Sequence, residues 1–137
     1  MNTRRLGLDI GDRKIGVALS DPGGILASPL TIIRRSDNQA DVAALIEVIA
    51  GHQVGQIVVG LPRSMDGSIG TQAEKVITFT EELSRHTDVP VDFRDERLST
   101  VSARRLLRMG RKTKGKIEDD AAAAAVILQS YLDEHSG

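Results

Sequence analysis

The sequence predicts an α/β domain built on a mixed five-stranded sheet with helices on both faces. Three observations lead to this fold class. Two segments near the N-terminus alternate apolar and small residues with a period of two, later segments carry apolar residues at helical spacing, and a continuous apolar run of strand length lies among them. The predicted element order is βββαβαβαα, and we expect a single domain over residues 1–137.

The first three predicted strands form an antiparallel meander. Residues 4–10 and 14–20 alternate apolar and small side chains, and "GDRK" between them is typical of a hairpin turn. The sequence "DPGG" at 21–24 predicts a second turn, and residues 25–33 a third strand. Consecutive strands joined by short turns usually pair as neighbours.

The pattern then changes to helical spacing. Apolar residues recur at i, i+3, i+4 and i+7 from Val42 to Ile49, between a polar cap in "SDN" and a stop at Gly51. The apolar run at 56–62 predicts a strand covered on both faces, followed by a loop over 63–70.

A second helix is predicted to open with a capping box formed by Thr71 and Glu74. Its expected buried face comprises Ala73, Val76, Ile77, Thr80 and Leu83. Residues 90–96 then predict a short last strand.

Two helices are predicted after that strand. The first is capped by Ser99 or Thr100 and ends near Gly110, and a basic connection over 111–117 follows. The last helix is expected to begin at Asp119 or Asp120, with an apolar face of Ala124, Ile127, Leu128, Tyr131 and Leu132.

Charge is concentrated in one segment. Seven of the thirteen residues 104–116 are basic and none is acidic, although the formal net charge of the chain is −1. The chain has only one Tyr and two Phe, so a nucleic-acid partner would be bound through its phosphates rather than by base stacking. The alternative is a solvated helix face. The candidate contacts are Arg97, Arg104, Arg105, Arg108, Lys112, Lys114 and Lys116.

Composition excludes several classes of protein. There is no cysteine, which rules out a disulfide framework and cysteine-based metal sites. The N-terminus has no apolar signal segment, and no run approaches the roughly 20 apolar residues of a membrane span. We expect a cytoplasmic protein with no membrane partner.

Three carboxylates are candidates for one site. Asp9 stands in an apolar strand on the same face as Gly7 and Gly11, where it needs a cation or several hydrogen-bond donors; turn chemistry is the alternative explanation. Glu96 ends a predicted strand and Asp120 begins a helix, so all three can meet at one edge of a sheet. Oxygen ligands suit Mg²⁺ or Mn²⁺, and two such ions about 4 Å apart can cleave a phosphodiester.

The chain resembles the YqgF/RuvX family of the RNase H-like superfamily, which includes the RuvC resolvases. The resemblance covers essentially all of the chain. It rests on "GLDIGDRKIGVALSD", "VVGLP" with "MDGS", "DERLST" and "DDAAAAAVILQSYL" in that order. It implies an RNase H-like fold with the strand order 3-2-1-4-5, in which strand 2 is antiparallel to the rest.

The resemblance also implies a catalytic, metal-binding triad of Asp9, Glu96 and Asp120. The third acid in the family stands seven residues before the Ile of "ILQ", which selects Asp120; Asp119 is the runner-up. Lys14 replaces the more usual Arg beside the first motif and keeps a cation there for nucleic acid.

These features predict a metal-dependent endonuclease, with 5′-end processing of precursor 16S rRNA as the first expectation. Cleavage of four-way DNA by a Holliday junction resolvase is the alternative. Two other classes stay open: a non-catalytic RNA-binding ribosome-assembly factor, and an ATPase or sugar kinase that uses "LDIGDRKIG" as a phosphate loop. The expected partner is structured RNA or branched DNA, and the expected state is a monomer or weak homodimer.

Overall fold

The structure is a computed structural model that describes residues 3–63, 66, 68–95 and 119–135, without the side chains of residues 119 and 120. The described strands are β1 (Arg4–Ile10), β2 (Lys14–Ser20), β3 (Ala27–Arg34), β4 (Val54–Leu61) and β5 (Val91–Asp95). The described helices are α1 (Asn38–Gly51), α2 (Thr71–Ser84) and α4 (Asp119–His135). The predicted helix before Gly110 and the basic connection 111–117 lie outside the described residues.

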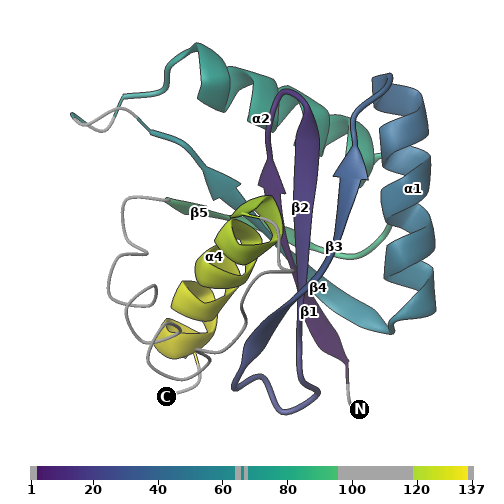
Figure 1. Cartoon of the computed structure of the whole chain (residues 1–137), viewed down its shortest axis with the longest axis vertical. Coiled ribbons are helices and arrows are strands. Elements are labelled where there is room, and N and C mark those ends of the chain that lie inside the picture. The colour runs from purple at the N-terminus through teal and green to yellow at the C-terminus, as the bar shows by residue number, and fades with distance from the viewer. Residues whose placement is uncertain (1–2, 64–65, 67, 96–118, 136–137) are drawn as a thin grey trace.

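The five strands form one mixed sheet in the order β3-β2-β1-β4-β5 (Figure 1). β2 is antiparallel to both β1 and β3, whereas β1, β4 and β5 are mutually parallel. The predicted fold class and strand order are therefore confirmed. Because parallel strands run in one direction, the carboxyl ends of β1, β4 and β5 lie at the same end of the sheet.

β1 and β2 have the predicted limits, but the other strands shift by one or two residues. β3 begins at Ala27 rather than at residue 25. The backbone N–H groups of Ile25 and Leu26 each donate to the Asp21 carboxylate at 2.8 Å, so this stretch belongs to a turn. These hydrogen bonds, that of Leu26 first, lower the pKa of Asp21.

Helices cover both faces of the sheet. Leu6, Leu8 and Ile10 of β1 belong to a buried cluster that also contains the inward faces of α1 and α2. The opposite face is covered by α4, which packs mainly against β1, β2 and β3 and less against β4. No helix among the described residues is long and apolar enough to cross a membrane.

The start of α2 corrects one prediction. The N-cap is Gly70 and no side chain caps the helix, so the predicted Thr71–Glu74 capping box is wrong. The Glu74 N–H instead donates to the Gly70 carbonyl at 3.0 Å as part of the helix itself. The buried face also contains Phe79, which the prediction omitted, whereas Ile77 is only partly buried.

α4 lies very close to β1 at Gly7. A Cβ atom at this position would stand 2.7 Å from Leu128 Cβ and 3.0 Å from the Ala124 carbonyl oxygen. The absence of a side chain at Gly7 therefore sets the distance between helix and sheet.

We expect Gly7→Ala to destabilise the fold by about 1–3 kcal/mol, because the added methyl group overpacks the contact with α4. The control is Gly51→Ala at the end of α1, where an added Cβ meets no atom within 4 Å. That substitution should leave stability unchanged or raise it by up to about 1 kcal/mol. Urea unfolding of both variants measures the difference, and equal effects would contradict the packing argument.

Candidate active site

Asp9 stands one residue before the end of β1, on the face that α4 covers. Its neighbours Leu8 and Ile10 point into the opposite core. Asp9 pairs in register with Gly16 of β2 and is half-buried. Gly16 presents no side chain beside the carboxylate, whereas the space over Gly7 is filled by Leu128 and Ala124 of α4.

The end of β5 lies at the same end of the sheet. Asp95, its last residue, is in register with Leu61, the last residue of β4. The predicted ligand Glu96 follows Asp95 directly in the sequence and lies outside the described residues. β4 lies between β1 and β5, and the carboxyl ends of all three strands lie at one end of the sheet.

α4 runs antiparallel to β1. Near the start of the strand, the Arg5 guanidinium lies 5.8 Å from the centre of the Tyr131 ring, close to the end of the helix. Gly7, two residues along, meets Leu128 and Ala124. Two strand residues advance about 6.6 Å and one helical turn about 5.4 Å, so the first turn of α4 lies near the strand end that carries Asp9.

Helical periodicity separates the two candidate acids on α4. Position 120 stands four residues before Ala124 and eight before Leu128, in the row that meets Gly7. Position 119 stands four residues before Ala123 and seven before Val126, both only partly buried. This spacing is consistent with Asp120 as the third acid, and that assignment stays a prediction.

Polar contacts with β3, the residues just before it, and β5 hold α4 in this position. Gln129 is fully buried; its carbonyl oxygen accepts from the Ala27 N–H at 2.9 Å and its amide donates to the Ile25 carbonyl at 2.9 Å. The Tyr131 hydroxyl donates to Asp92 of β5 at 2.7 Å, and burial, followed by this carboxylate, raises the pKa of Tyr131. The helix is therefore fixed against both sliding and rotation.

Arg94 of β5 makes further hydrogen bonds to α4. The Arg94 guanidinium donates to Ser130 Oγ at 3.0 Å and to a Glu134 carboxylate oxygen at 2.6 Å. The hydrogen bond from Arg94 to Glu134, followed by the positive charge of the guanidinium, lowers the pKa of Glu134.

Two cations flank the site on β2 and β3. Lys14 is half-buried and precedes Gly16 by two residues, which places it on the Asp9 face of the sheet. Arg34 stands directly opposite Lys14 across the strand pair and is exposed. The sequence prediction missed Arg34, because the strand register that brings the two cations together is not visible in a single segment.

The other predicted basic contacts, from Arg97 to Lys116, lie outside the described residues. Among the described residues, no group of three or more His, Asp and Glu side chains could hold a metal ion. Two of the three predicted ligand side chains, those of Glu96 and Asp120, fall outside that part of the chain. The candidate metal site therefore remains a prediction built on Asp9 and on backbone placement.

A cleft of about 440 Å³ lies beside the β1–β2 turn, between the starts of α1 and α2. Ile10 lines it, whereas Asp9 does not. The cleft is therefore on the face opposite the candidate carboxylate site and is separate from it.

The sequence pattern of the RuvX family, described as Holliday junction resolvase, matches residues 3–134. The chain belongs to the RuvX family. A relative from Dehalococcoides mccartyi, named "Putative pre-16S rRNA nuclease", is 52% identical over 125 residues, covering 91% of this chain and 94% of the relative. A second relative with the same name, from Desulforamulus reducens, is 46% identical over 132 residues, covering 95% of this chain and 96% of the relative. This RuvX chain is a nuclease.

Solved structures agree with the fold. RuvC of Thermus thermophilus in complex with Holliday junction substrate superposes with a TM-score of 0.71 at 13% identity, covering 98% of this RuvX chain and 96% of that chain. The likeness confirms the RNase H-like fold.

We expect Asp120→Asn to lower nuclease activity by at least about 100-fold, because the substitution removes a charge next to the reacting phosphate. Asp119→Asn is the matched control, since it changes the same group one residue away and about 100° around the helix. Cleavage rates of both variants, measured with the same labelled substrate, test the assignment. A larger loss at Asp119 would reverse it.

Proposed function

We propose that this RuvX chain is a metal-dependent endonuclease that processes the 5′ end of precursor 16S rRNA. The choice of precursor 16S rRNA as the substrate is supported by the name of the relative that is 52% identical and covers 91% of this chain. The placement of Asp9 at the end of the sheet where β5 also ends, and near the start of α4, supports the catalytic part of the proposal. The chain has no cysteine, which fits work in the reducing cytoplasm.

The residues fit a divalent cation. Asp9, Glu96 and Asp120 would offer only carboxylate oxygens, the donors that Mg²⁺ and Mn²⁺ prefer. Two bound ions would activate a water molecule and stabilise the leaving oxygen of the phosphodiester. The chain itself contributes the strand that presents Asp9 and, opposite it on β2, Gly16, which carries no side chain.

Lys14 and Arg34 would bind the phosphates next to the cleaved bond. The two side chains stand directly opposite each other across β2 and β3, on the same face as Asp9, so one phosphate group could contact both. Arg97, Arg104, Arg105, Arg108, Lys112, Lys114 and Lys116 would extend the contacts along the backbone of the substrate.

We expect Arg34→Gln to weaken binding of RNA uniformly across sequences and to reduce the slope of log affinity against log salt by about 1, because one phosphate contact is lost. Arg85→Gln is the control: Arg85 is also exposed, but it pairs with Glu82 at the far end of α2. Fluorescence anisotropy at several salt concentrations gives both slopes. Equal slopes for the two variants would remove Arg34 from the proposed interface.

The substrate is tested by side-by-side cleavage of a 16S rRNA precursor and a synthetic four-way DNA junction with Mn²⁺. We expect the wild-type chain to cleave the RNA, and Asp9→Asn to lower that rate by at least about 100-fold while RNA binding persists. Preferential cleavage of the junction would favour resolvase activity, which needs two active sites on a symmetric dimer. No cleavage of either substrate by wild type would favour a non-catalytic assembly factor.

A further inference from the structure

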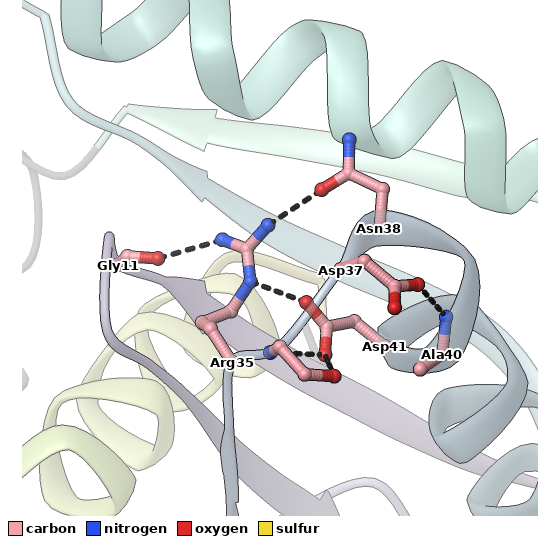
Figure 2. A network of polar contacts seen from close by, with 7 residues as sticks. Gly11, Arg35, Asp37, Asn38, Ala40 and Asp41 are labelled. Atoms are coloured by element: carbon pink, nitrogen blue, oxygen red, sulfur yellow. Dashed lines mark hydrogen bonds and ion pairs between the residues drawn. The ribbon is translucent and has the colours of Figure 1, made fainter.

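One arginine connects the β1–β2 turn to both helices on the far side of the sheet. The Arg35 guanidinium donates to the Gly11 carbonyl at 2.8 Å, to an Asp41 carboxylate oxygen at 2.7 Å and to the Asn38 side-chain carbonyl at 2.9 Å (Figure 2). Its central carbon lies 4.9 Å from the centre of the Phe79 ring in α2. Gly11 is thereby joined through one side chain to the first turn of α1 and to α2.

The backbone of the same residue holds the other end of the turn. The Arg35 N–H donates to the Arg13 carbonyl at 2.8 Å, and the turn is closed by the Gly11 N–H, which donates to the Lys14 carbonyl at 2.9 Å. Arg35 thus contacts the turn at two carbonyl groups, one on each side of Asp12.

Burial gives this arrangement a single geometry. The Asp41 side chain is 2% exposed and that of Arg35 18% exposed. The second Asp41 oxygen accepts from the Ser36 N–H at 3.1 Å, so the carboxylate cannot rotate without losing this partly buried hydrogen bond. The carboxylate in turn orients the planar guanidinium, whose fork reaches several acceptors at once.

We propose that Arg35 is a positioning residue for Asp9. Asp9 faces α4, and the Arg35 side chain lies on the opposite side of the sheet, so Arg35 acts through the backbone. It fixes the Gly11 carbonyl, two residues after Asp9, and thereby the strand end that presents the carboxylate. The inference rests on the proposed function, in which Asp9 is a metal ligand.

The test compares Arg35→Lys with wild type and with Leu83→Ala. Lysine keeps a positive charge beside Asp41, but its single ammonium group cannot reach all three acceptors in the same geometry. Leu83 is fully buried on α2, one turn beyond Phe79, and makes none of the contacts with the turn. Leu83→Ala therefore controls for a general loss of stability.

Three quantities are measured at a temperature where all three proteins are folded: amide hydrogen exchange, Mn²⁺ affinity by calorimetry, and kcat and KM on the precursor RNA. In Arg35→Lys we expect the Gly11 amide to lose at least tenfold in protection relative to the Leu45 amide in α1. We expect Mn²⁺ affinity and kcat each to fall by about 10- to 100-fold, with KM changed less than about twofold. Leu83→Ala should lower protection at both amides without this drop in kcat.

Two results would overturn the inference: equal loss of protection at Gly11 and Leu45, or a loosened Gly11 with unchanged kcat and Mn²⁺ affinity. A wild-type chain that neither binds Mn²⁺ nor cleaves RNA would overturn the proposed function, and with it the role of Arg35 toward Asp9. Loss of protection confined to Gly11, together with weaker Mn²⁺ binding, supports the inference even if the precursor RNA is cleaved slowly, because neither measurement depends on the RNA.

Discussion

The close contact between α4 and Gly7 is the constraint on which the rest of the structure depends. Leu128 and Ala124 occupy the space that a side chain at position 7 would take, so the helix can approach the strand at this point. This contact, with the polar ties of Gln129 and Tyr131, determines where the helix begins relative to the sheet. A candidate carboxylate on the first turn of a helix is useful only if that turn is brought to the right strand end.

The two faces of the sheet have different roles. The face covered by α1 and α2 is a continuous apolar core, at whose edge Arg35 and the buried Asp41 form an ion pair. The face covered by α4 has small residues along β1 and β2 and carries Asp9 and Lys14. In the proposed function, Arg35 on the first face would hold the β1–β2 turn, and the metal site would lie on the second face. The short turn between β1 and β2 connects the two faces, because Arg35 contacts it from one face and Asp9 precedes it on the other.

Much of the fold was predictable from local patterns. Alternation defined β1 and β2 to the residue, because each strand has one face packed on a core and small residues on the other. The apolar face of α4 was predicted correctly, because a helix against a sheet buries a regular stripe. The start of β3 was not predicted, since the hydrogen bonds of Asp21 to Ile25 and Leu26 compete with strand pairing.

The sequence singled out a candidate site residue where a residue type contradicted its surroundings. Asp9 in an apolar strand is such a contradiction, and the structure places it at the sheet end where clefts form. Arg34 and Arg35 gave no such signal, because an arginine pair after a strand is ordinary. Their significance depends on long-range partners, Lys14 for one and Gly11 with Asp41 for the other, which no single segment reveals.

The central claim is that strand order and helix placement bring Asp9, Glu96 and Asp120 to one divalent cation site. The most direct measurement is anomalous scattering from Mn²⁺ in crystals of the wild-type chain. The account predicts a peak within about 2–2.5 Å of carboxylate oxygens of all three residues. Mn²⁺ bound elsewhere, or bound without Asp9, would contradict it.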